Sequence, residues 1–139
     1  MTAKEYLNQA AELKRRIRQE EDRIKFIRSE MESPRPIRYD KDMIQKSASG
    51  DAMERYMIKL EKEEKRLLKL KEKHIDTFHR IRQRIMHVQP SLYADVLYMR
   101  YLEGKTIGVI ANEMHYSYEW TCKIHGRALQ DFSRRNPDI

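Results

Sequence analysis

The chain has 139 residues, a formal net charge of +7, 37% charged residues and only 9% aromatic residues. This balance suits long solvated helices and argues against a large compact core or a β-sandwich. No apolar run approaches the roughly 20 residues that span a bilayer, and the first residues lack the apolar stretch of a secretory signal. The single cysteine, Cys122, excludes an internal disulfide framework and a zinc knuckle built on cysteine pairs.

Residues 2–31 are predicted to form one long helix. Apolar residues recur at alternating spacings of three and four, a heptad pattern that Glu20 interrupts. The residues of this pattern are Ala3, Tyr6, Ala10, Leu13, Ile17, Ile24, Ile27 and Met31. Pro34 and Pro36 should end the helix, because proline lacks a backbone donor and disfavours a helical residue before it. We therefore expect a linker at 32–50.

A second long helix is predicted from Asp51 to about Val88. One heptad frame collects most of its apolar residues, namely Met53, Met57, Leu60, Leu67, Phe78, Ile81, Ile85 and Val88. Glu64, Lys71 and His74 fall on the same frame and make its middle polar. A linker of this length permits an antiparallel hairpin, and a self-associating coiled coil is equally compatible with the pattern. Residues 1–89 are therefore expected to form an oligomerisation region.

The remaining residues, 90–139, read as a small helical domain. A helix over 92–103 should end at Gly104, a common helix C-terminal signal. Two shorter helices follow, each preceded by a residue suited to cap it, Thr106 and Ser117. His115 falls in the break between them. This order of helix, tight turn and helix is typical of a helix-turn-helix, whose second helix enters the major groove of DNA.

The basic excess lies outside this domain. Residues 90–139 carry six basic and six acidic residues, whereas 51–89 carry eleven and seven. Electrostatic attraction alone therefore does not predict strong DNA binding by the last fifty residues. Arg80, Arg82 and Arg84 could grip phosphates beside the domain, or they could belong to an ordinary solvated helix face.

The segment VLYMRYLEGKTIGVIANEMHYSYEWTCKIHGRAL resembles region 4 of the sigma-70 family of RNA polymerase factors. The resemblance rests on the pairs Glu103-Gly104 and Ile110-Ala111, on the capping Ser117, and on Arg-Ala-Leu at 127–129. It covers about residues 91–135. Because a long helical region precedes it, the chain is most similar to small phage-encoded regulators of this type, including late-gene activators.

The resemblance implies a set of DNA contacts. The base-reading positions of the family fall on Tyr118, Glu119, Cys122 and Lys123. A glutamate can accept from the cytosine amine in the major groove, and Lys123 keeps a donor. The family commonly has arginine where this chain has Tyr118 and Cys122, so a different target sequence is implied. Backbone contacts are expected from Thr106, Ser117, Trp120 and Arg127, together with Arg80, Arg82 and Arg84.

These observations predict an all-α, sequence-specific double-stranded-DNA-binding regulator of transcription. We expect it in the cytoplasm of a bacterial host, as a homo-oligomer, with RNA polymerase as a further candidate partner. No catalytic motif, metal-ligand set or cofactor loop stands out, so no enzymatic activity, metal, cofactor or membrane partner is expected. Two other functions stay open: a small terminase-type DNA-packaging protein, and a protein that binds polymerase or a host factor without contacting DNA.

Overall fold

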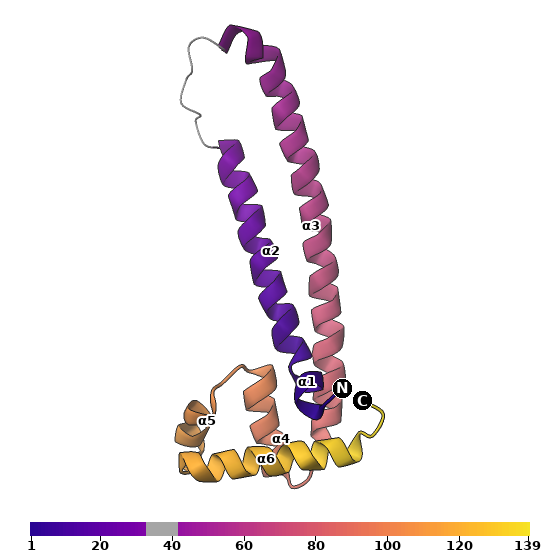
Figure 1. The fold of residues 1–139 in the computed structure, drawn as a ribbon, viewed down its shortest axis with the longest axis vertical. Helices are drawn as coiled ribbons and strands as arrows, with labels where there is room; N and C mark the ends of the chain where they lie inside the picture. Colours follow the sequence, from indigo (N-terminus) through magenta and orange to yellow (C-terminus); the bar gives the residue numbers. More distant parts are fainter. Residues whose placement is uncertain (33–41) are drawn as a thin grey trace. The chain divides into compact units, whose positions relative to one another are not determined.

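The computed structural model describes the backbone of residues 1–32 and 42–139 and the side chains of 1–32 and 51–139. Every regular element in these ranges is a helix (Figure 1), which confirms the predicted all-α class. The elements are α1 (Ala3–Leu7), α2 (Gln9–Glu32), α3 (Asp42–Met86), α4 (Ser91–Leu97), the π-helix η1 (Tyr98–Leu102), α5 (Ile107–Met114) and α6 (Tyr118–Arg135).

The chain divides into two compact units. Unit 1 joins Met1–Lys14 to Glu72–Ile139, and unit 2 is Arg15–Lys71. The sequence placed a boundary between residues 89 and 90, whereas the compact unit that holds the C-terminal helices also contains the first residues of the chain and the end of α3. The difference arises because the C-terminal helices share a core with these distant segments.

The predicted N-terminal helix is present as two consecutive helices. Thr2 caps α1: its side chain accepts from the Glu5 N–H at 3.1 Å, and the Glu5 carboxylate accepts from the Thr2 N–H at 2.8 Å. Asn8 separates α1 from α2, which continues to Glu32. Each position of the predicted heptad frame is buried or half-buried, including Glu20.

Helix α3 begins earlier than predicted. The linker expected at 32–50 is wrong from Asp42 onward, because residues 42–50 belong to α3. The two prolines expected to end the first helix lie outside the described residues. The helix was predicted to start after Gly50. A single glycine inside a helix costs only about 1 kcal/mol, and α3 continues through Gly50.

The buried face of α3 differs from the predicted frame by one residue at alternate positions up to Phe78. Leu60, Leu67, Ile81 and Ile85 are buried or half-buried as expected, and so is Val88 just after the helix. Between them, however, the more buried members are one residue earlier than predicted: Tyr56, Glu63, Leu70 and Thr77 in place of Met57, Glu64, Lys71 and Phe78. Met53 and Met57 are consequently exposed.

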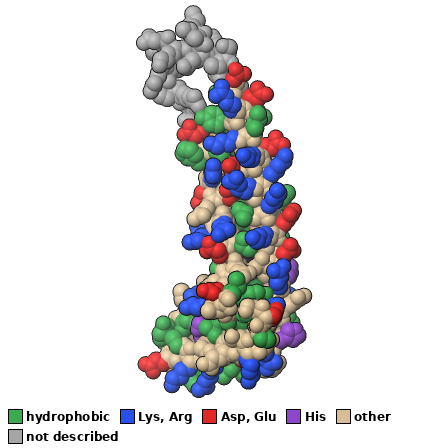
Figure 2. Space-filling model, turned by 45° about the vertical axis from the view of Figure 1, so that its right-hand side comes forward, with side chains coloured by type: hydrophobic (Ala, Val, Ile, Leu, Met, Phe, Trp, Pro, Cys, Tyr) green, Lys and Arg blue, Asp and Glu red, His purple; other side chains and the backbone are tan. Residues whose placement is uncertain are grey.

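Within unit 2, α2 and α3 run antiparallel and side by side (Figure 1). Among the described side chains, ion pairs join Arg23 to Glu63, Arg28 to Glu64, and Lys71 to Glu21. Lys and Arg side chains alternate with Asp and Glu over the exposed surface of α3 (Figure 2), as in a solvated helix face.

A buried carboxyl pair lies inside unit 2. Glu20 and Glu63 are both buried, and Glu20 Oε1 and Glu63 Oε2 have no hydrogen-bond partner among the described residues. Burial, and then the neighbouring Glu63, raise the pKa of Glu20. The interaction with Glu20, together with Arg23 and Arg66, holds the pKa of Glu63 below its ordinary value despite its burial. The pair therefore favours a state with one shared proton.

Unit 1 has two neighbouring hydrophobic clusters. The larger draws on both ends of the chain, with Ala3, Tyr6, Leu7, Ala10, Ile81, Ile85, Val88, Leu97, Tyr101, Ala128 and Phe132. The smaller joins Val96, Ile110 and Ile124, which come from α4, α5 and α6. Helix α6 contributes to both clusters, so its inner face is held firmly from several directions.

The segment before α5 departs from the single helix predicted over 92–103. After α4 the backbone widens into the π-helix η1, closed by a bond from the Glu103 N–H to the Tyr98 carbonyl at 3.0 Å. Gly104 follows with φ +72°, and the Lys105 N–H bonds the Met99 carbonyl at 3.0 Å. Gly104 thus ends the helix as predicted, because glycine takes this left-handed conformation without a Cβ clash.

Candidate nucleic-acid interface

The α5–α6 pair is built as its sequence predicts, with a capping side chain before each helix. The Thr106 hydroxyl accepts from the Val109 N–H at 3.3 Å, and the Ser117 hydroxyl accepts from the Trp120 N–H at 3.1 Å. Thr121 is buried and donates to the Ser117 carbonyl at 2.9 Å. Both predicted caps are therefore confirmed, and they fix where each helix starts.

The break between α5 and α6 is a tight left-handed turn at His115. This residue has φ 60° and ψ 37°. The Tyr116 N–H bonds the Ala111 carbonyl at 3.0 Å, and the His115 N–H bonds the Asn112 carbonyl at 3.3 Å. These are the two bonds of a Schellman motif. The turn satisfies the last carbonyls of α5 and redirects the chain into α6 within three residues.

Helix α6 has one buried and one exposed face. Its inner face consists of Thr121, Ile124, Ala128, Asp131 and Phe132, all buried. The residues between them on the opposite side are exposed. Gly126 lies on this outer side, and a Cβ there would meet nothing within 4 Å. The outer face is therefore not covered by the described part of the protein, and its backbone is open to close approach.

All four predicted base-reading residues lie on the exposed side of the first turns of α6. Tyr118 is 61% exposed, and Glu119, Cys122 and Lys123 are also exposed. Together they offer a phenol, a carboxylate, a thiol and an ammonium group at one end of the helix. This mixture contains both donors and acceptors, as reading of base edges requires.

Trp120 and Arg127 form a cation–π pair beside this face. The Arg127 guanidinium lies over the Trp120 ring, 5.4 Å from its centroid. Such a contact attracts the cation to the face of the indole ring. With Tyr116 and Tyr118, the exposed Trp120 makes the start of α6 rich in aromatic surface.

The three arginines of α3 separate into two kinds. Arg80 and Arg82 are exposed. Arg84 instead donates to the Asp138 carboxylate at 2.8 and 3.0 Å and to the Asn136 side-chain oxygen at 2.8 Å. It also lies over the Tyr6 ring. Arg84 therefore fastens the segment after α6 to α3, and its guanidinium is already engaged within the protein.

Sequence reasoning missed a polar cluster around Asp131, at the far end of α6. The buried Asp131 carboxylate accepts from the Gln89 N–H at 3.2 Å, from Arg135 Nε at 2.7 Å and from Arg134. Although burial opposes ionisation, these bonds hold the pKa of Asp131 below its ordinary value. Only the spacing of Asp131 to Arg134 and Arg135, at i+3 and i+4, could have indicated it.

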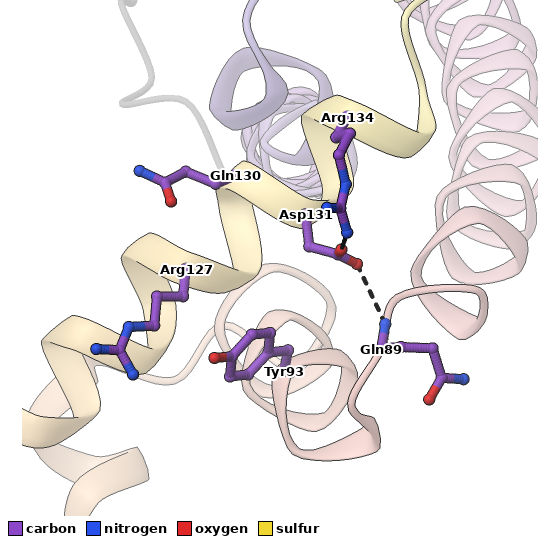
Figure 3. Close-up of a pocket in the computed structure, with 6 residues that line it drawn as sticks. All are labelled: Gln89, Tyr93, Arg127, Gln130, Asp131 and Arg134. Atoms are coloured by element: carbon purple, nitrogen blue, oxygen red, sulfur yellow. Dashed lines mark hydrogen bonds and ion pairs between the residues drawn. The ribbon is translucent and has the colours of Figure 1, made fainter.

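Next to Asp131 is a hollow of about 420 Å³ (Figure 3). Tyr93 of α4 and Gln89 line one side of it, and Arg127, Gln130, Asp131 and Arg134 of α6 line the other. Its lining thus combines two arginines, polar side chains and the carboxylate of Asp131.

No match was found when the chain was compared with models of known protein families, with curated proteins and with solved structures. In residues 1–32 and 51–139, no three side chains of His, Cys, Asp or Glu come together as a metal site would require. Nor does any helix of the described chain combine the length and apolar content needed to cross a bilayer.

Proposed function

We propose that this chain is a sequence-specific double-stranded-DNA-binding regulator of transcription, of the phage-encoded type that resembles sigma-70 region 4. In this proposal α5 and α6 form a helix-turn-helix, and the outer face of α6 lies in the major groove. One observation carries the proposal: the side of α6 that bears Glu119 and Lys123 is exposed, while the opposite side is locked into two hydrophobic clusters. A rigid helix with a free polar face is what groove reading requires.

The residues on this face suit base recognition. Glu119 can accept from a cytosine amine, and Lys123 can donate to guanine O6 or N7. Cys122 and Gly126 are small, which allows the helix axis to approach the base edges closely. The N–H groups and the Ser117 hydroxyl at the start of α6, and the Thr106 hydroxyl at the start of α5, would meet phosphates, as helix N-termini commonly do.

Selection of bound duplexes from a random pool, at stated salt, tests the proposal directly. We expect one sequence to be enriched. Glu119→Ala and Lys123→Ala should each lower discrimination by about 1–3 kcal/mol at one base position. Arg82→Ala should weaken binding to all sequences alike and reduce the salt dependence. If no sequence were enriched, the proposal of DNA reading would be contradicted. It would also be contradicted if both α6 variants selected the same sequence with unchanged discrimination between bases.

We also propose that unit 2 mediates self-association. Met53, Met57 and Leu68 are exposed and share one face of α3, because separations of four and eleven residues are close to whole turns. Two reading heads on one oligomer would raise the effective concentration for DNA and offset the even charge balance of residues 90–139. Light scattering distinguishes a dimer from a terminase-like ring, and a monomeric chain would contradict this part.

A second function is favoured by the aromatic surface at the start of α6. Tyr, Trp and Arg are the residues most enriched at protein-binding hot spots, and Tyr116, Tyr118, Trp120 and Arg127 lie together here. This surface would suit a protein partner such as RNA polymerase. This function would be favoured over DNA reading by two results together. The chain would retain purified bacterial polymerase and lose it in Trp120→Ala, and neither protein would bind duplex DNA.

A further inference from the structure

The length of α6 constrains what its two ends can contact. The helix has 18 residues, which corresponds to roughly 27 Å at 1.5 Å per residue. The major groove is only about 12 Å wide. If the N-terminal turns of α6 read bases, the C-terminal turns must leave the groove and pass over the sugar-phosphate backbone.

A stripe of mostly basic side chains runs along the surface of α6 from its base-reading end toward its C-terminus. Lys123, Arg127, Gln130 and Arg134 follow one another at spacings of four, three and four, so they form one stripe along the helix. The stripe begins at the predicted base-reading end with Lys123 and is basic at three of its four positions. It ends at the hollow of about 420 Å³ beside Tyr93 and Gln89 (Figure 3).

Two arginines at this hollow are held in place by the protein itself. The Arg127 guanidinium lies over the Trp120 ring. Arg134 is bound to Asp131 Oδ1, while the Gln89 N–H bonds Asp131 Oδ2 and anchors the carboxylate to the segment before α4. A guanidinium has five N–H donors, and the bond to Asp131 engages one nitrogen of Arg134. Fixed donors of this kind bind a phosphate with little loss of side-chain entropy.

We propose that this hollow is a seat for one DNA phosphodiester, bound by Arg127 and Arg134 with Gln130 and Tyr93 at its edge. Asp131 acts as a positioning residue that orients Arg134. The inference rests on the proposed function, because it assumes that α6 lies against duplex DNA. It adds a contact about three turns beyond the base-reading residues and so defines how α6 is aligned along the groove.

The chain offers a matched control for the test. Arg134 and Arg135 both pair with Asp131 in the last turn of α6, but only Arg134 lines the hollow. With a random-sequence duplex, Arg134→Ala should lower the slope of log affinity against log salt by about 0.9 and lower the affinity about tenfold. Arg135→Ala should change both quantities much less. Thermal melting of each variant shows whether the fold is retained.

Neutral methylphosphonates placed one at a time along the selected duplex then locate the contact. Wild type should lose affinity about tenfold at one or two positions, Arg134→Ala should lose nothing further there, and Arg135→Ala should behave as wild type. Asp131→Asn, which keeps an oxygen for the Gln89 N–H, should also lose the sensitivity at those positions.

The possible failures are distinguishable. If a sequence were selected but no methylphosphonate position showed an effect that depends on Arg134, the proposed phosphate-binding site alone would be overturned. Absence of a selected sequence, with an Arg134-specific salt slope on random duplex, would overturn sequence reading and leave the phosphate contact standing. Absence of any duplex binding would overturn both.

Discussion

The Tyr101 hydroxyl and the His125 Nε2 atom lie 2.8 Å apart, and the two rings are stacked with centroids 5.6 Å apart. This contact ties η1 to the middle of α6. Burial lowers the pKa of His125, with further contributions from Arg100 and Lys4. Burial also raises the pKa of Tyr101. Both groups are therefore favoured in their neutral forms, which keeps the hydrogen bond between them intact at neutral pH.

Unit 1 should lose stability in mild acid through His125. Because the pKa of His125 is lower in the folded chain than its ordinary value of 6.5, its contribution is complete above pH 6.5 and is lost as the pH falls through the folded pKa. His74, whose pKa burial also lowers, adds to the effect. Thermal unfolding between pH 8 and pH 5 measures it. His125→Gln should flatten the profile, and replacement of the exposed His87 by Gln should not; equal profiles for all three proteins would contradict the assignment.

The turn between α5 and α6 should tolerate only residues that accept a left-handed backbone. His115→Val should lower the free energy of unfolding by about 1–2 kcal/mol, because a β-branched residue clashes at positive φ. His115→Asn should be nearly neutral, since asparagine adopts this conformation more readily than most residues. Urea titration of the three proteins checks the prediction, and equal midpoints would contradict it.

The first turns of the chain should be essential for the stability of the C-terminal helices. Leu7 is fully buried in the same cluster as Phe132, so Leu7→Ala should cost about 2–5 kcal/mol. Leu68→Ala, which truncates an exposed leucine, should cost much less. A fragment of residues 90–139 lacks most of this cluster and should not unfold cooperatively. Cooperative melting of that fragment would show that the distant residues are dispensable.

Glu20 in unit 2 should contribute a dependence of stability on pH in the opposite sense to His125. The pKa of Glu20 is raised, so its contribution is present at low pH and lost as the pH rises through its folded pKa. Glu20→Gln replaces the shared proton with a permanent amide donor, and its benefit over wild type should grow between pH 4.5 and pH 8. Circular dichroism during urea unfolding measures the difference. Glu21→Gln, which removes only the exposed pair with Lys71, should lack this trend; a constant benefit of Glu20→Gln would refute the shared proton.

Local signals predicted the α5–α6 pair well. Thr106, Ser117 and Gly104 act through contacts within a few residues, so their roles can be inferred from the sequence alone. The heptad frame of α2 was also predicted correctly, because its positions are nearly all apolar. In α3 the predicted frame was wrong at alternate positions, since counting apolar residues favours Met57 and Phe78. The structure instead buries Thr77 rather than Phe78, and it buries Glu63, which hydrophobicity gives no reason to expect.

Long-range relationships could not be predicted. Nothing near Leu7 indicates that it packs in one cluster with Phe132, and nothing near Arg84 indicates that its partner is Asp138. For the same reason, the compact units do not follow the boundary predicted between residues 89 and 90. At the site, the exposed residues of α6 follow from helical periodicity, whereas the hollow beside Asp131 needs the loop at Gln89 to approach α6 in three dimensions.

The cluster that joins Ala3, Tyr6 and Leu7 to Ala128 and Phe132 also has a consequence for synthesis. On the ribosome, residues 3–10 emerge long before residues 124–132, so the early turns have no partner while most of the chain is translated. Closing contacts over so large a sequence separation is slow compared with forming local helices. The α2 and α3 segments of unit 2 can form local helical contacts while the polypeptide is still growing, but α6 acquires its rigid backing only after residues 124–132 have been synthesised, so the orientation of its outer face is fixed late.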